Sequence, residues 1–173
     1  MTGKLLAIVL LLSAVVAGVG MYYLQIYGFY YEVEPQSGQD VALMTEEGGV
    51  PAPIAYSGFQ AIDADSSPIR YRGCFETDLK PDQMTGFVPV ENPEPLIAPG
   101  WFDCYDAVTL ADALKSGQAK AFLGAKNIHF GVDRIVAITT DGKGYVWHAL
   151  NNCGEKAYDG TVVGEECPTR PDN

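Results

Sequence analysis

The chain has 173 residues, about the size of one domain; 47% of them are apolar and 19% are charged, which is too apolar for a disordered chain. The net charge is −11, from 22 acidic and 11 basic residues. The chain therefore lacks the positive charge with which nucleic-acid-binding proteins attract phosphate.

The first predicted element is a membrane-spanning helix. Residues 5–24 carry no charged side chain, and a helix of this length extends about 30 Å, which matches the hydrocarbon core of a bilayer. Five of the ten tyrosines follow between positions 22 and 31. Aromatic side chains favour the level of the lipid headgroups, so we predict an anchor with an aromatic belt over residues 1–31.

The charges beside this segment predict its orientation. Lys4 precedes it and acidic residues follow it, so the positive-inside rule places the N-terminus in the cytoplasm and the remaining chain in the periplasm of a bacterial inner membrane. A cleaved signal peptide is the alternative, because residues 15–17 offer small side chains before Gly18. The apolar segment is longer than the ~7–15 residues of a signal-peptide core and ends in aromatics, which favours an uncleaved anchor.

Small side chains recur along the predicted helix at a spacing of one turn. Ala14 and Gly18 form one such pair, and Ser13 and Ala17 form another. Small residues at this spacing let a second helix approach closely, so we expect these positions to pack against a partner helix. The alternative is ordinary composition, since glycine and alanine are common in membrane helices.

Four cysteines follow the membrane segment: Cys74, Cys104, Cys153 and Cys167. None forms a C-x-x-C pair, so a zinc ribbon or a redox dithiol is disfavoured. Of the three ways to pair them, the short separations favour Cys74–Cys104 and Cys153–Cys167, each closing a loop worth about 3 kcal/mol in the chain-entropy model. Disulfides indicate an oxidising compartment, and this argument does not depend on Lys4.

Residues 32–40 are predicted as a tether, followed by a soluble domain over residues 41–173. Glycines and prolines in residues 48–53 break the first expected strand. A turn composition at residues 65–68 separates the next two. These three strands are predicted at residues 41–44, 58–64 and 69–76.

The middle of the domain contains a proline-rich segment and an aromatic cluster. Residues 89–99 hold four prolines, which predicts an extended surface loop. Trp101, Phe102 and Tyr105 then surround Cys104. We interpret them as a packed corner of the core, with an exposed aromatic contact site as the alternative.

The last part of the chain predicts a helix and three strands. Thr109 fits a helix N-cap and Gly117 ends that helix, after which residues 119–123 form a strand. Asp141-Gly142 between two β-rich runs, over residues 133–150, is typical of a hairpin, and its apolar faces predict packing on both sides. The fold class is therefore α+β: one N-terminal transmembrane helix, then a small, strand-rich, disulfide-braced domain with at least one helix.

Two histidines are candidates for chemistry. His148 shares an apolar strand face with Val146 and Leu150, a pattern more typical of a hydrogen-bonded core histidine than of a ligand. His129 lies in a loop-like stretch, where it would form a metal or acid–base site only together with Asp133 or Asp103.

Arg70 and Arg72 are the other candidates, as two of four arginines in an acidic chain. They would bind an anionic ligand, or pair internally with the surplus carboxylates, and we expect the internal pairing. Asp63 and Asp65 are the expected partners, because this segment lacks the glycine and glutamate of a calcium loop. Trp101 completes the set of predicted partner or ligand contacts.

Motifs of the common enzyme classes do not occur in the sequence. It contains no G-x-S-x-G, S-x-x-K, H-E-x-x-H, P-loop or G-x-G-x-x-G pattern, and no C-x-x-C-H haem-attachment site. We therefore predict no cofactor, no metal and no catalytic activity.

Four stretches carry a resemblance to a known family: YYLQIYGFYYEV, AIDADSSPIRYRGCF, APGWFDCYDA and NIHFGVDRIVAITTDGKGYVWHALNNCG. Over nearly its whole length, the chain resembles an uncharacterised alphaproteobacterial family of single-span membrane proteins with a small periplasmic domain. Members sometimes carry a histidine-kinase label, but this chain has no phosphoacceptor helix and no ATP-binding glycine boxes. The resemblance implies architecture and source and leaves the function open.

Three functions remain in competition. The first is a non-catalytic accessory or assembly subunit of an inner-membrane complex, most specifically a respiratory one, whose acidic domain docks a basic partner such as a c-type cytochrome. The second is a membrane-anchored periplasmic ligand-binding or sensing domain. The third is an enzyme that uses a histidine or a reactive cysteine pair. The span and the missing motifs favour the first.

Overall fold

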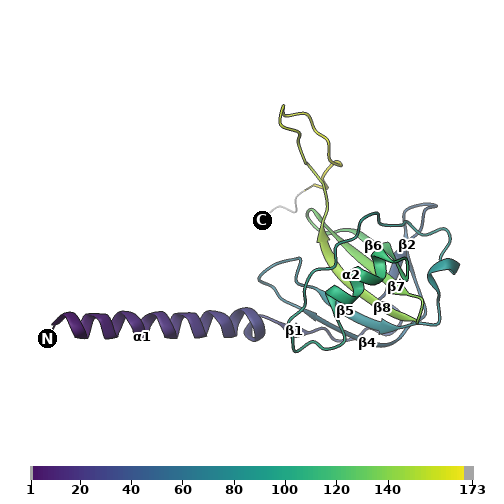
Figure 1. The fold of residues 1–173 in the computed structure, drawn as a ribbon. Helices are drawn as coiled ribbons and strands as arrows, with labels where there is room; N and C mark the ends of the chain where they lie inside the picture. The colour runs from purple at the N-terminus through teal and green to yellow at the C-terminus, as the bar shows by residue number, and fades with distance from the viewer. Residues whose placement is uncertain (1, 170–173) are drawn as a thin grey trace.

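The computed structural model describes residues 2–169 and shows a long helix attached to a strand-rich domain (Figure 1). Helix α1 covers Thr2–Tyr23 and continues as the π-helical segment η1, Leu24–Gly28. Over Gly3–Gly28 the mean hydropathy of the most apolar window is 2.5, and none of that window is buried by the rest of the chain. The helix is long and apolar enough to cross a membrane, and its composition and N-terminal place also fit a signal sequence.

The domain is built on a six-stranded antiparallel sheet with the order β1-β4-β5-β8-β7-β6. A two-stranded sheet, β2-β3, packs near β6. Two short helices complete the domain, namely η2 at Pro81–Gln83 and α2 at Ala107–Lys115. The strands are β1 Tyr31–Glu32, β2 Ala42–Met44, β3 Pro51–Pro53, β4 Ser57–Asp63, β5 Arg72–Glu76, β6 Ala119–His129, β7 Val132–Thr139 and β8 Lys143–Leu150. The predicted α+β class is confirmed.

The predicted hairpin forms the centre of the sheet. Strands β7 and β8 pair with Val136 opposite Val146 and Ile135 opposite Trp147. Val136, Val146 and Trp147 have no exposed surface. Both faces of the hairpin are therefore buried, as the apolar pattern predicts.

Two cores lie on the two faces of the sheet. One face packs Val136, Val146 and Tyr71 against Leu43 of β2. The other packs Trp147 and its neighbours under α2, which crosses that face in Figure 1, and against the buried side chains of Phe102 and Tyr105. Within the aromatic cluster, Phe102 and Tyr105 therefore form a packed corner of the core.

Strand β8 contains a glycine that no other residue can replace without rearrangement. Gly144 lies directly opposite Phe75 of β5 in the sheet, and a Cβ at position 144 would overlap the outer edge of the Phe75 ring. The absent side chain leaves the volume that the ring fills, which accounts for a glycine in the middle of a strand.

The start of α2 differs from the prediction. The N-cap is Asp106, whose carboxylate accepts hydrogen bonds from the backbone amides of Val108 (2.9 Å) and Thr109 (3.1 Å). The Thr109 hydroxyl donates to the same carboxylate, so Thr109 lies inside the first turn and is not the cap. These bonds, first that of the Thr109 hydroxyl, lower the pKa of Asp106.

Two segments predicted to be irregular are ordered in the sheets. Within residues 48–53, Pro51–Pro53 forms β3, an edge strand where a missing amide costs no ladder bond. Within the predicted tether, Glu32 pairs with Ile62 of β4, and the Val33 amide donates to Ala61. Further along, the Tyr56 hydroxyl donates to Asp40 (2.6 Å) and accepts from the Gly38 amide (2.8 Å), so these residues belong to the folded domain.

Candidate functional site

Side chains of the domain form hydrogen bonds with the C-terminal end of the apolar helix. The indole Nε1 of Trp101 donates a hydrogen bond of 2.7 Å to the backbone carbonyl of Ile26. The Arg70 guanidinium donates to both the side-chain and the backbone oxygen of Gln25. These two side chains reach the last turn of the helix, where backbone carbonyls lack intrahelical partners.

Aromatic rings fill the space around these bonds. Tyr27 stacks on Trp101 with 6.4 Å between ring centroids, and Tyr30 meets Trp101 edge-on at 6.0 Å. The Arg70 guanidinium lies 5.4 Å from the centre of the Tyr30 ring. The predicted aromatic belt is thus also a contact surface for the domain. Because β1 begins at Tyr31, three residues after the helical segment ends at Gly28, little free chain separates helix and sheet.

This junction corrects two expectations from the sequence. Arg70 was expected to pair with Asp63 or Asp65, but it contacts Gln25 and Tyr30, and Asp65 instead accepts from the Tyr31 hydroxyl (3.2 Å). Trp101 is half-buried and contacts the protein's own helix rather than standing free. We call this set, Gln25–Tyr30 with Arg70 and Trp101, the helix–domain junction.

Arg72 lies elsewhere, inside the domain. Its guanidinium donates to the backbone carbonyls of Leu96 (2.8 Å), Ile69 (2.8 Å) and Tyr71 (2.7 Å), and only 4% of the residue is exposed. Burial lowers its pKa. The expected pairing with a carboxylate is therefore wrong, because carbonyl oxygens satisfy this arginine. Its role is to hold the turn before β5 and the proline-rich segment together.

The two histidines lie close to each other, beside Tyr71. Their ring centroids lie 5.9 Å apart, with His129 at the end of β6 and His148 within β8. His148 is 1% exposed and stacks on Tyr71 at 4.5 Å. The Arg134 guanidinium lies 4.4 Å from the centre of the Tyr71 ring, and its Nε donates a hydrogen bond of 3.1 Å to the Nε2 of His148.

The hydrogen bonds of His148 specify its neutral form. Its Nδ1 lies 2.9 Å from the carbonyl oxygen of Pro68, which can only accept, while its Nε2 faces the Arg134 donor. The proton is therefore assigned to Nδ1 and the lone pair to Nε2. Burial, above all, lowers the pKa of His148 to about 4, and it raises the pKa of Tyr71 to about 12. His148 matches the prediction of a hydrogen-bonded core histidine.

The metal or acid–base site considered for His129 does not assemble with Asp133. The Asp133 carboxylate accepts from the Asn127 amide (2.8 Å) and from the Asn151 side chain (2.7 Å), and Lys126 lies 3.7 Å away. Asp103 is exposed on the loop before α2. Among residues 2–169, no three His, Cys, Asp or Glu side chains are placed to hold a metal ion.

Both predicted disulfides form. Cys74 of β5 joins Cys104, which fixes the aromatic corner to the sheet, and Cys153 joins Cys167. The second bridge closes a hairpin over residues 151–168 that extends away from the sheet in Figure 1. This hairpin was not predicted, although the turn-forming pair Asp159-Gly160 between the two cysteines indicates it.

Two grooves open on the face that carries α2. One, of about 710 Å³, lies between the proline-rich segment and α2, with Leu114 and Phe122 among its lining residues. The other, of about 600 Å³, is lined by Trp147, Leu96 and Leu123 and bounded by Lys126. The indole nitrogen of Trp147 and the hydroxyl of Tyr105 are buried without a hydrogen-bond partner in the described part of the chain.

Comparison with protein families identifies residues 41–168 as a match to DUF6446, a family of unknown function. The chain belongs to this family, and the matched region spans the domain from β2 to the second disulfide. No curated protein and no solved structure matches the chain.

Proposed function

We propose that this member of the DUF6446 family is a non-catalytic accessory or assembly subunit of a membrane complex, bound to it through its helix. The observation that carries the proposal is an apolar helix that its own chain leaves unburied, yet whose end is held by the domain. An anchor alone needs only a flexible connection. When the helix packs in a complex, a junction fixed by hydrogen bonds also sets where the domain lies relative to that complex.

The helix presents a face of small residues for this packing. Gly3, Ala7, Ala14 and Gly18 recur at spacings of four and seven residues and so share one face, which includes one of the two predicted pairs. Ser13 and Ala17 flank it. Close packing of helix backbones at such a face is a main source of helix association in membranes.

The proposal includes a location and a class of complex. The N-terminus is cytoplasmic, the domain is periplasmic, and the complex lies in the inner membrane of an alphaproteobacterium. Among such complexes we propose a respiratory one. The histidine-kinase label has no support, since both histidines lie on strands.

Charge supports a soluble partner of the domain as well. Exposed carboxylates lie on the proline-rich segment, at Glu91 and Glu94, and on α2 with its N-cap, at Asp112 and Asp106, while Lys115 and Lys120 line the groove between the two elements. An acidic surface attracts a basic protein over distances of about a Debye length, so a c-type cytochrome fits this part of the proposal.

The test compares two matched pairs of substitutions in the full-length protein, expressed in its native membrane. Ala14→Leu with Gly18→Leu enlarges side chains on the small face. The control, Val9→Leu with Val16→Leu, enlarges side chains on the opposite face of the same helix.

After extraction in mild detergent, co-purifying membrane proteins are quantified by mass spectrometry. We expect the first pair to lower their recovery at least tenfold and the control to retain it. Equal recovery with both pairs would contradict helix packing through this face.

A ligand-binding or sensing domain is the second candidate function. The groove beside Trp147 favours it, because apolar side chains such as Leu96 and Leu123 line it and Lys126 supplies a charged group at its edge. This function predicts a rise in the melting temperature of the full-length protein with a specific small molecule, abolished by narrowing the groove with Ala149→Leu.

A further inference from the structure

The hairpin over residues 151–168, which we call the disulfide hairpin, is ordered although it projects from the domain. Its two arms meet at the bridge between Lys156 and Val162, and the Val163 amide donates to the Glu155 carbonyl at 2.9 Å. At the tip, the Ala157 amide donates to Thr161 at 2.8 Å. Figure 1 shows the hairpin leaving the domain on a different side from α1. The disulfide hairpin is therefore an ordered segment that projects from the domain.

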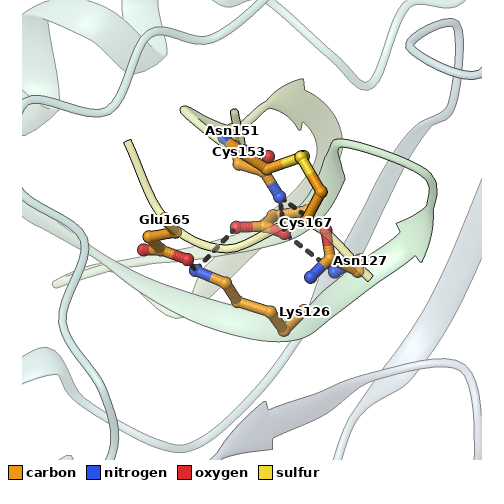
Figure 2. Close-up of a disulfide and its surroundings, with 7 residues drawn as sticks. Lys126, Asn127, Asn151, Cys153, Glu165 and Cys167 are labelled. Atoms are coloured by element: carbon orange, nitrogen blue, oxygen red, sulfur yellow. Dashed lines mark hydrogen bonds and ion pairs between the residues drawn. A yellow bond between two sulfur atoms is a disulfide. The ribbon is translucent and has the colours of Figure 1, made fainter. Parts of the chain in front are cut away.

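The base of the hairpin is fixed to β6 and β7, and Figure 2 shows the residues around its disulfide. The Cys153–Cys167 disulfide joins the two arms, and Lys126 of β6 forms an ion pair with Glu165. Asn151 accepts from the Cys153 amide (3.0 Å) and donates to Asp133 of β7 (2.7 Å). The hairpin therefore cannot swing freely about its base.

The tip carries apolar side chains that are largely exposed. Tyr158 is fully exposed, and Val162 and Val163 are 59% and 57% exposed. The turn beside Tyr158 is held by Asp159, whose carboxylate accepts from the Thr161 amide at 3.0 Å. That bond lowers the pKa of Asp159. Tyrosine is enriched among the residues that dominate protein interfaces.

The charges of the hairpin select the kind of partner. It carries Glu155, Asp159, Glu165 and Glu166 against a single lysine, Lys156. Anionic lipid headgroups would repel this arm, and so would nucleic acid. A protein pocket with an apolar floor and a basic rim complements both its tyrosine and its carboxylates.

We propose that the disulfide hairpin is a docking arm, which inserts Tyr158 into an apolar, basic-rimmed pocket of a partner protein. The inference deepens the proposed function, because it assigns the domain's contact within the complex to one loop. It places that contact at the tip of the hairpin, whose base residues Asn151 and Glu165 line the groove beside Trp147.

The test uses a photoreactive phenylalanine analogue at position 158 of the full-length protein in its native membrane. The matched control carries the analogue at position 108, which is also exposed but lies on α2. Tyr158→Ala and Tyr158→Phe are compared in the same pulldown. We expect a crosslink from position 158 alone, to a protein that co-purifies in a fixed ratio, at a segment with apolar and basic residues. Recovery should fall at least tenfold with Tyr158→Ala and stay within about threefold with Tyr158→Phe.

The other outcomes separate this inference from the proposed function. A complex that co-purifies unchanged with Tyr158→Ala, or a crosslink to lipid, overturns the docking arm and leaves the helix-bound subunit standing. A protein that purifies alone, yet crosslinks from position 158 to a soluble protein with such a pocket, supports the arm and overturns the subunit. Equal crosslinking from positions 158 and 108 overturns the arm.

Discussion

Acidification tests the assignment of His148 as a buried neutral side chain. Protonation at Nε2 would break its bond with Arg134 and put two positive charges 3.1 Å apart at a residue that is 1% exposed. The pKa of His148 is lowered from 6.5 to about 4 in the folded protein, mainly by burial. The unfolded chain therefore binds a proton that the folded chain does not, between these two values of pH.

The expected size of the effect follows from this interval. The free energy of unfolding should fall as the pH drops from 6.5 toward 4, by about 1.4 kcal/mol per pH unit and roughly 3 kcal/mol in total. Other groups titrate nearby: burial raises the pKa of Asp63, which works in the opposite direction below its folded pKa. The comparison with His148→Gln isolates the histidine, since Asp63 remains in both proteins.

The assay is urea unfolding of the detergent-solubilised full-length protein between pH 7.5 and 4.5. Fluorescence reports the core, because Trp147 precedes His148 on β8 and is fully buried. We expect the wild-type protein to lose stability relative to His148→Gln as the pH falls below 6.5. Parallel curves for the two proteins across this range would refute a neutral, buried His148.

Four further predictions concern stability and are read from unfolding curves, with a spin label added for the third and proteolysis for the fourth. Gly144→Ala should cost about 1–3 kcal/mol because its Cβ meets the Phe75 ring, whereas Gly100→Ala, where a Cβ meets nothing within 4 Å, should change little; equal effects would contradict the packing. Asp106→Ala should cost about 1 kcal/mol through loss of the N-cap, and an effect no larger than that of Asp103→Ala would argue against it. Trp101→Phe should cost about 1 kcal/mol by removing the bond to Ile26, and should increase the motion of a spin label on the domain relative to the helix; unchanged motion would show that the junction does not fix the domain. Replacing Cys153 and Cys167 by serine should open residues 154–166 to protease while the core stays folded, whereas replacing Cys74 and Cys104 should lower the stability of the whole domain; the reverse order would contradict the placement of the bridges.

Local chemistry made parts of the fold predictable. Asp141-Gly142 between β-branched runs specifies the β7–β8 hairpin, since few residues tolerate that turn. The disulfide pairs followed from their short loops. The cap of α2 was misplaced because threonine is a residue type that caps helices, while the Thr109 hydroxyl itself donates to Asp106.

The helix–domain junction had no such local signal. Trp101 binds a backbone carbonyl that lies 75 residues away in sequence, and a backbone acceptor leaves no mark on residue type. Strand β1 was hidden for a related reason, because Tyr31 fits both an aromatic belt and a strand edge. Of the five residues predicted as partner or ligand contacts, Arg70 and Trp101 lie at this junction, where they contact the protein's own helix.

The most direct test of a helix-bound subunit is to identify the proteins that co-purify with the wild-type chain from its native membrane. The full-length protein, extracted in mild detergent and separated by size, is read by mass spectrometry for its partners and their ratios. We expect a set of integral membrane proteins in constant stoichiometry with this chain. Recovery of the protein alone under every mild condition would contradict its role as a subunit.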